Sequence, residues 1–143
     1  MPRQNSHLIP LVLALALPAL GAAGCGSTTT TPTTPTTPAV TITETFTGTV
    51  AVGGAAVFSF GVTGTGNVTA TYKSISPDSG VAMGLALGTW NGTTCSVVIT
   101  NDNAFVNSTI IGAASAAGDL CVRAYDIGKL GATQTVELSV THF

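Results

Sequence analysis

The sequence predicts an all-β domain, folded as a two-layer antiparallel β-sandwich of about eight strands. Only 7% of the 143 residues are charged, while threonine, valine and glycine are abundant, and this composition favours strands over ion-paired helices. From residue 40 onward, apolar and polar residues alternate with a period of two, which is the period of a half-buried strand. Turn sequences containing glycine or proline separate these runs, and strands of this kind pack face to face in two layers.

The first strand is expected over residues 40–52, where threonines occupy every second position from 41 to 49. The apolar residues of its other side are Val40, Ile42, Phe46, Val50 and Val52. Glu44 and Gly48 interrupt that apolar side. Gly53-Gly54 then turns the chain, because glycine adopts the backbone conformations that tight turns require.

Two further strands show the same alternation before a turn at 76–80, in which proline and glycine both stand at suitable positions. The turn between these two strands is expected at 64–67. Their expected core-facing residues are Phe58, Phe60, Val62, Val68, Ala70 and Tyr72.

A β-hairpin is predicted at Trp90-Asn91-Gly92-Thr93, because Asn-Gly between two strand-like runs is typical of a two-residue type I′ turn. In that register Trp90 lies opposite Thr93, and Gly88 lies opposite Cys95. The side chains expected to face the core are Met83, Leu85, Leu87 and Val98. The side chains expected to point away from it, over a floor of glycine and alanine, are Trp90, Cys95, Val97 and Ile99.

The C-terminal part of the chain predicts the remaining strands. In the run 119–126, the residues expected in the core are Leu120, Val122 and Ala124, and those expected on the outer face are Cys121, Arg123 and Tyr125. Another strand is expected around 105–111, and Val136, Leu138 and Val140 mark the last one. An immunoglobulin arrangement is disfavoured, because its tryptophan lies between the two cysteines whereas Trp90 precedes both Cys95 and Cys121.

The N-terminal 24 residues resemble a bacterial lipoprotein signal peptide. An apolar run from Leu8 to Leu20 follows Arg3, and Ala22-Ala23-Gly24-Cys25 resembles the lipobox, in which the cysteine is acylated and becomes the first residue of the mature protein. The resemblance implies a lipid-anchored protein of the bacterial cell envelope, and Gly26 after the cysteine favours the outer membrane. A membrane-spanning helix is disfavoured, because the run is shorter than the about 20 residues that a span needs and contains two prolines. Plain secretion is the remaining alternative.

With Cys25 acylated, Cys95 and Cys121 remain, and in the oxidising compartment that an exported chain reaches we expect them to form a disulfide. The alternative is a pair of unpaired buried thiols. If both cysteines face outward, they can bridge where their strands are neighbours in one sheet. A metal site is not expected, because His142 is the only histidine after residue 25 and the ligand set stays incomplete.

The mature chain is divided into a linker and one domain. Residues 25–39 contain the lipidated cysteine and a Thr/Pro tract, which forms an extended spacer with or without glycosylation. Residues 40–143 are enough for one domain with its own core.

The order of segments in this domain resembles the bacterial pre-peptidase C-terminal domain, a jelly-roll-like sandwich attached to secreted proteases and other exported proteins. The resembling segments are 46–50, 56–60, 66–70, 81–87 and 117–125. Members of that family often carry aspartates in the strand that corresponds to 81–87, and some bind calcium. This chain has Met, Gly, Leu and Ala there, so we expect no calcium site in that strand.

Several kinds of chemistry are excluded or disfavoured. The mature chain has three cationic side chains against six carboxylates, so no basic patch for nucleic acid exists, and no glycine-rich phosphate loop supports nucleotide binding. His142 is expected to fray at the end of the chain and not to act in catalysis. Asp119 and Asp126 lie seven residues apart and face opposite sides of one strand, and Asn101-Asp102-Asn103 is expected to be a solvated loop instead of a calcium site. No catalytic residue, metal or cofactor is expected.

The candidate binding residues are the outward-facing Trp90, Val97, Ile99, Arg123 and Tyr125. A flat floor of small residues beside two aromatic rings is suited to stacking a sugar or to contacting a protein. The alternative is that residues 101–118 cover this face and Trp90 is purely structural. We therefore expect a non-catalytic accessory or structural lipoprotein, or a module that binds polysaccharide, peptidoglycan or an envelope protein; an enzyme is the least favoured class.

Overall fold

The structure is a computed structural model that describes residues 40–143. The strands are β1 (Ile42–Val50), β2 (Ala55–Val62), β3 (Gly66–Ser76), β4 (Met83–Trp90), β5 (Cys95–Ala104), β6 (Thr109–Ala114), β7 (Gly118–Tyr125) and β8 (Gln134–His142). The predicted signal peptide, the lipid attachment site at Cys25 and the linker 25–39 lie outside the described residues. Within residues 40–143, no helix is long and apolar enough to cross a membrane.

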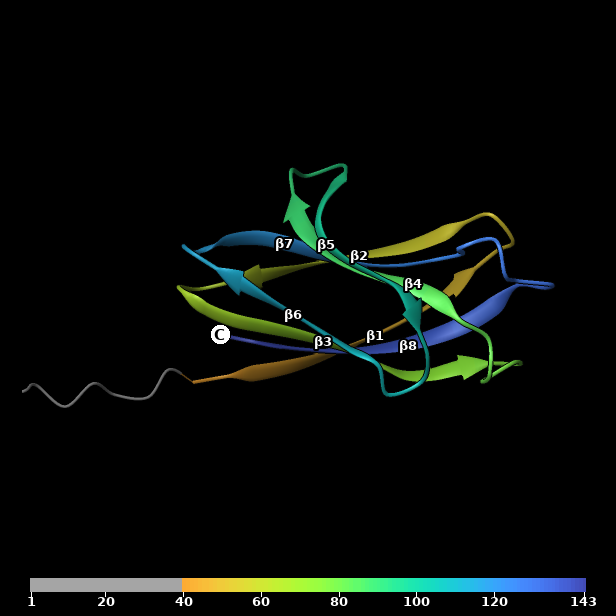
Figure 1. Cartoon of the computed structure of the whole chain (residues 1–143). Helices are drawn as coiled ribbons and strands as arrows, with labels where there is room; N and C mark the ends of the chain where they lie inside the picture. Colours follow the sequence, from red (N-terminus) through yellow and green to blue (C-terminus); the bar gives the residue numbers. More distant parts are fainter. Residues whose placement is uncertain (1–39) are drawn as a thin grey trace, which may run out of the picture. The chain divides into compact units, whose positions relative to one another are not determined.

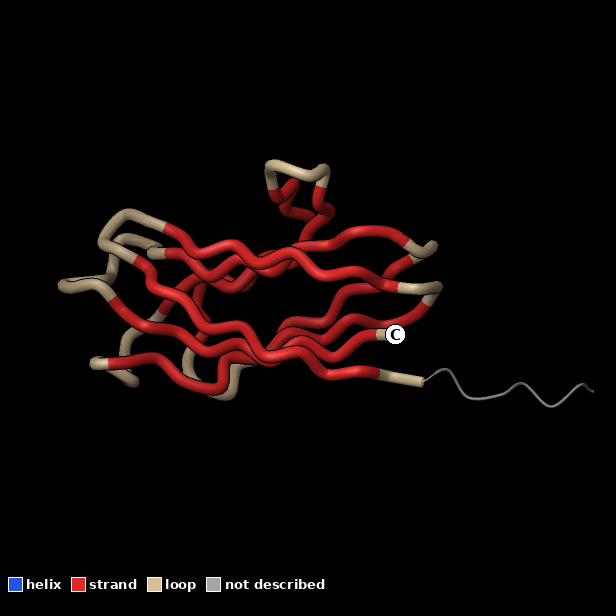
Figure 2. Tube along the Cα trace, turned by 180° about the vertical axis from the view of Figure 1, so that it is seen from behind, coloured by secondary structure: helices blue, strands red, loops and turns tan. Residues whose placement is uncertain are grey.

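The strands form two four-stranded sheets, ordered β1-β8-β3-β6 and β2-β7-β4-β5 (Figure 1). Pairing is nested and antiparallel: β1 pairs with β8, β2 with β7, β3 with β6, and β4 with β5. One long hairpin with its tip between β4 and β5, rolled into two layers, produces this order, which is that of a jelly roll. Figure 2 shows the two layers from behind, with loops gathered at both ends. The predicted all-β sandwich of about eight strands is confirmed.

The core lies between the two sheets, and most of the residues predicted to face it are buried. The fully buried large side chains include Tyr72, Met83, Leu85, Val122, Val136, Leu138 and Val140. At the ends of β1 the prediction placed too many residues on the buried side. Val40, Ile42 and Val52 are 80%, 49% and 59% exposed. β1 is an edge strand, and these three residues lie at its first position or beyond its ends, where the other sheet does not cover them.

Both interruptions of the apolar side of β1 have a physical reason. Glu44 Oε1 lies 2.8 Å from Nε2 of His142, so the acid that faces inward has a hydrogen-bonding partner on the neighbouring strand. A side chain at position 48 would place its Cβ 2.7 Å from the Phe58 ring, so glycine makes room for that ring.

The prediction that His142 frays is wrong. Its side chain is completely buried, and its ring lies 5.1 Å from the ring of Phe60, measured between centroids. Thr63 N donates a hydrogen bond to Phe143 O at 2.9 Å, which holds the residue that follows. The end of β8 is therefore part of the sandwich, and the burial of every second residue of β8 continues through position 142.

The strand expected at 105–111 begins later than predicted. β5 continues to Ala104, and a turn occupies residues 105–108, in which Ser108 N donates to Phe105 O at 2.9 Å. Asn107 has a φ of 70°, a left-handed conformation that asparagine tolerates better than most residues. β6 therefore starts at Thr109.

The predicted register of the β4–β5 hairpin is also wrong. Trp90 pairs with Cys95, so the connection has four residues, 91–94, instead of two. A second change follows at a β-bulge: Gly88 pairs with Val97 but Leu87 pairs with Ile99, which leaves Val98 as an extra residue.

The bulge reverses the orientation of the residues that follow it, because one inserted residue moves every later side chain to the other face of the strand. Val98, predicted in the core, is 70% exposed. Ile99, predicted to point outward, packs against the core.

Candidate functional site

The tip of the β4–β5 hairpin bends back over the outer face of the sheet β2-β7-β4-β5. Gly88 allows this bend, because a Cβ there would lie 2.2 Å from Ser96 O and 2.9 Å from Val97 Cα. The backbone of β5 can approach β4 this closely only where β4 has no side chain. The tip is the green segment that rises above the upper layer in Figure 1.

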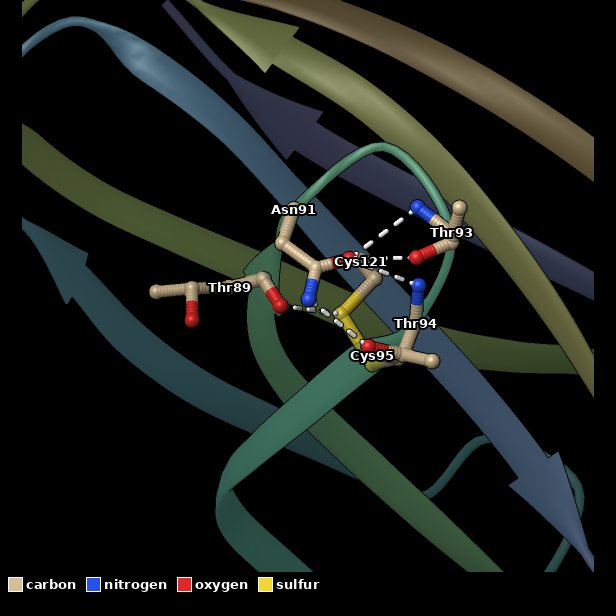
Figure 3. Close-up of a disulfide and its surroundings, with 6 residues drawn as sticks. All are labelled: Thr89, Asn91, Thr93, Thr94, Cys95 and Cys121. Atoms are coloured by element: carbon tan, nitrogen blue, oxygen red, sulfur yellow. Dashed lines mark hydrogen bonds between the residues drawn. A yellow bond between two sulfur atoms is a disulfide. The ribbon is translucent and has the colours of Figure 1, made fainter.

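A disulfide between Cys95 and Cys121 fixes the tip in this position (Figure 3). The predicted pairing is confirmed, but the two strands are not neighbours, since β4 lies between β5 and β7 in the sheet. The Cα atoms are nevertheless only 5.8 Å apart, because the start of β5 passes over β4 at Gly88. The bridge therefore ties the tip to the interior strand β7.

The Asn91 side chain organises the four-residue connection. Its Oδ1 accepts hydrogen bonds from Thr93 N at 3.0 Å, from Thr93 Oγ1 at 3.0 Å and from Thr94 N at 2.8 Å. Its Nδ2 donates to Thr94 Oγ1 at 2.8 Å. Figure 3 shows the hydrogen bonds around the Asn91 amide. Asparagine therefore acts here through its side chain and not as a residue of a type I′ turn. Gly92 completes the loop with a φ of 97°.

A shallow pocket lies between the tip and the strands beneath it. Its lining residues are Ala55, Val57, Trp90, Thr93, Thr94, Cys95 and Arg123. The floor comes from β2 and β7, where Val57 pairs with Arg123, and the wall comes from the hairpin tip. Val57 is 41% exposed although it is apolar, and Trp90 is partly exposed. The pocket therefore combines an indole ring, an aliphatic surface, two hydroxyl groups and a guanidinium group.

Tyr125 continues this surface next to Arg123. The Arg123 Cζ lies 5.0 Å from the centroid of the Tyr125 ring, within the range of a cation–π contact. The ring also covers Gly84, where a Cβ would lie 2.2 Å from the ring atoms. The Tyr125 hydroxyl donates to Asp102, and burial together with this hydrogen bond raises the pKa of Tyr125 to about 12.

The five predicted binding residues do not all meet. Trp90 and Arg123 line the pocket, and Tyr125 adjoins it through Arg123. Val97 lies on the hairpin and is 39% exposed, but it does not line the pocket. Ile99 lies between the two sheets because of the bulge at Val98.

The sequence did not indicate Ala55, Val57, Thr93 or Thr94 as residues of the site. An apolar residue on the polar side of β2, directly before Phe58, was a usable signal for Val57. The two threonines could not be assigned, because the assumed two-residue turn placed Thr93 in a strand.

A second opening lies between the sheets at the edge formed by β5 and β6. It is lined mainly by apolar side chains, among them Val68, Leu87, Ile99 and Leu120. Thr89 is the only residue there with a polar side chain, whereas the Trp90 pocket offers several hydrogen-bonding groups of defined orientation. The Trp90 pocket is therefore the better candidate for a selective site.

The prediction that residues 101–103 form a solvated loop is wrong, because they belong to strand β5. Asn101 Oδ1 accepts from Asn103 N at 3.0 Å, and Asp102 accepts from Tyr125, so these oxygens have partners within the protein. Among residues 40–143, no group of three or more histidine, cysteine, aspartate and glutamate side chains is arranged to hold a metal ion.

Comparisons with known proteins give likenesses among solved structures. No protein family matches the chain, and no curated protein does. Among solved structures, the chain is similar to PliG from Aeromonas hydrophila, a periplasmic lysozyme inhibitor of g-type lysozyme. The identity is 14% and the TM-score 0.44, and the alignment covers 69% of this chain and 82% of PliG.

Proposed function

We propose that this chain is a lipoprotein of the bacterial cell envelope, anchored through Cys25 in the outer membrane, whose β-sandwich binds a polysaccharide without transforming it. The observation that carries the binding function is the pocket formed by Trp90, Val57 and Arg123 under a hairpin tip that a disulfide holds in place. A sugar ring stacks well on an indole, and neighbouring hydroxyl and guanidinium groups supply hydrogen bonds to its hydroxyls.

The position of residues 101–118 favours binding over a purely structural role for Trp90. These residues include the end of β5 and all of β6, and β6 belongs to the opposite sheet. They contribute no side chain to the pocket, so they do not cover it. The disulfide and the Asn91 hydrogen bonds also hold the tip in place without a ligand, which lowers the entropic cost of binding.

The environment of His142 supports a non-catalytic function. Its ring is completely buried, its Nε2 is paired with Glu44, and its Nδ1 has no hydrogen-bonding partner. A substrate would have to open the end of the sandwich to reach it. The jelly-roll order is compatible with the resemblance to the pre-peptidase C-terminal domain, and we propose that relationship as well.

The binding function is tested by fluorescence titration, because Trp90 is the only tryptophan of the chain. The mature chain with Cys25→Ser, which remains unacylated, is titrated with soluble polysaccharides and tested for retention on insoluble ones. Trp90→Ala lacks the fluorophore, so it is compared with the parent protein by retention on insoluble polymers, where loss of one stacking contact is expected to weaken binding about tenfold or more. Phe105→Ala is the matched control, since Phe105 is an aromatic residue that is 39% exposed and lies outside the pocket.

Equal retention of Trp90→Ala and the parent protein on every polymer would reject the pocket as the binding site. The anchor is examined on the unaltered chain by intact-mass spectrometry, which is expected to find acyl groups on Cys25. An unmodified first residue would reject the lipid anchor, and the protein would then be a secreted binding protein.

A further inference from the structure

Arg123 has no carboxylate partner in the part of the chain that the structure describes. The ion pair found among residues 40–143 joins His142 to Glu44, at the first strand and the last. The guanidinium lies over the face of the Tyr125 ring, with its Cζ 5.0 Å from the ring centroid. Asp102 accepts a hydrogen bond from the Tyr125 hydroxyl and does not pair with Arg123. A partly buried cation therefore lines the pocket with its hydrogen-bond donors uncommitted.

The two threonines of the tip have hydroxyl groups of opposite character. Asn91 Oδ1 must face Thr93 N and Thr94 N, because both backbone groups donate to it, and this fixes the orientation of the amide. The Thr93 hydroxyl then donates to Oδ1, which leaves its lone pairs free to accept. The Thr94 hydroxyl accepts from Nδ2, which leaves its proton free to donate. Together they form an acceptor and a donor suited to the hydroxyl groups of a sugar.

We propose that the pocket selects a saccharide that carries a carboxylate, such as a uronic acid residue of an acidic polysaccharide. The sugar ring lies on Trp90 and Val57, its hydroxyls contact Thr93 and Thr94, and its carboxylate is bound by Arg123. A guanidinium presents paired donors that match a carboxylate in geometry as well as in charge. This inference rests on the proposed binding of polysaccharide at the same pocket.

The charge of the rest of the molecule makes Arg123 decisive. The mature chain has six carboxylates against Lys73, Arg123 and Lys129, so its overall field does not attract an acidic polymer. Selection for a carboxylate must therefore come from the local contact at Arg123. Affinity is expected to decrease moderately with salt, because one partly shielded charge pair is involved.

The test uses polygalacturonate and alginate, each compared with its methyl ester, in titrations monitored by Trp90 fluorescence. The parent protein is expected to bind at least one acid form about tenfold to a hundredfold more tightly than the ester, the range of a charge-assisted hydrogen-bonded pair. Arg123→Gln is expected to remove that preference and Arg123→Lys to restore part of it. Lys129→Gln, which removes an exposed charge outside the pocket, is expected to leave the preference unchanged.

The outcomes separate this inference from the proposed function. Equal affinity of the parent protein for acids and esters, no binding of either acid, or an unchanged preference in Arg123→Gln would overturn selection for a carboxylate. Binding of a neutral polysaccharide that is lost in Trp90→Ala would still support the pocket as a sugar site. Thermal unfolding of each variant establishes that a lost preference does not come from a lost fold.

Discussion

The two sheets of the sandwich differ in regularity. In the sheet β1-β8-β3-β6, β1 and β8 pair without interruption from Ile42–His142 to Val50–Gln134, and every second residue of β8 is buried. The β3–β8 ladder of this sheet shifts register once, between Tyr72 and Ser74. In the sheet β2-β7-β4-β5, the β4–β5 ladder shifts register twice, and Gly84 and Gly88 are covered by a ring and by backbone. The sheet β1-β8-β3-β6, the more regular of the two, contributes the longest uninterrupted pairing, between β1 and β8. The irregular sheet contributes a bent hairpin, and with it the pocket.

Removing the disulfide is expected to have the largest effect on stability, and to affect the irregular sheet more than the regular one. The cysteines are 26 residues apart, and on the chain-entropy model closing a loop of that length stabilises the fold by about 3.5 kcal/mol. Urea unfolding of Cys95→Ala/Cys121→Ala, compared with the parent protein, measures the loss. Amide hydrogen exchange should accelerate most in β5 and the tip, and least in β8.

Parent protein treated with a reductant is the control for the double variant, because it keeps both side chains. Uniform acceleration of exchange in β5 and β8 would contradict the assignment of the bridge to the irregular sheet. A loss of stability below about 1 kcal/mol would contradict the stabilisation that loop closure predicts.

The next largest effect on stability is expected from removing a hydrogen bond between the two sheets. Tyr72 of β3 donates from its hydroxyl to Gly84 O of β4 at 2.9 Å, so it joins the regular sheet to the irregular one. Tyr72→Phe keeps the ring and removes the bond, at an expected cost of about 1 kcal/mol. Burial, and to a lesser extent Tyr125, raises the pKa of Tyr72 well above its ordinary value of about 10.

Because the folded state holds this proton more tightly than the unfolded state, the associated stability is complete below about pH 10 and is lost as the pH rises through the raised value. Tyr72→Phe should therefore flatten the alkaline decline in stability. The chain has two tyrosines, so absorbance titration of Tyr125→Phe follows Tyr72 alone and should show ionisation only on unfolding. Ionisation of Tyr72 near pH 10 in the folded protein would refute this assignment.

The smallest effect is expected at Asp126, where the loop after β7 meets the turn between β1 and β2. Its carboxylate accepts hydrogen bonds from Gly53 N, Gly128 N, Lys129 N and Leu130 N, at 2.7 to 3.1 Å. These donors, Gly53 first among them, lower the pKa of Asp126. The stability that they provide is complete above about pH 4 and is lost as the pH falls through the lowered value.

Asp126→Asn removes the titration and the acceptor for Gly53 N, and it should flatten the acid limb of a stability–pH profile measured by urea unfolding. Asp119→Asn, on the same strand as Tyr125 but away from this turn, is the matched control. Equal acid sensitivity of Asp126→Asn and the parent protein would show that the turn does not depend on this carboxylate.

In the regular sheet the sequence predicted the buried positions well but not the ends of β1, the start of β6 or the burial of His142, and in the irregular sheet it predicted the β4–β5 hairpin less well, for a physical reason. Burial of every second residue is local information, so Val136, Leu138 and Val140 were correctly assigned to the core. The sequence pattern shows Glu44 only as an interruption of the apolar side of β1, because its partner His142 is distant in sequence and close only in the folded sheet.

The site was predictable in part. Trp90 and Arg123 were both expected on the outer face, and they meet there in one pocket. Ile99 was misplaced because the length of the connection depends on the Asn91 side chain and the bulge depends on close packing at Gly88. Both are contacts between specific atoms, which a pattern of apolar and polar residues does not encode.

The pairing of the first strand with the last suggests how the domain can be rearranged by engineering. Ile42 and His142 are direct partners in an antiparallel ladder, where opposite Cα atoms lie about 5 Å apart. A short peptide could join these positions, and the chain could be reopened in the surface turn at 105–108, giving a circular permutant of the same fold. For the same reason the domain should be suited to insertion into an exposed loop of a host protein, with both of its ends entering at one place.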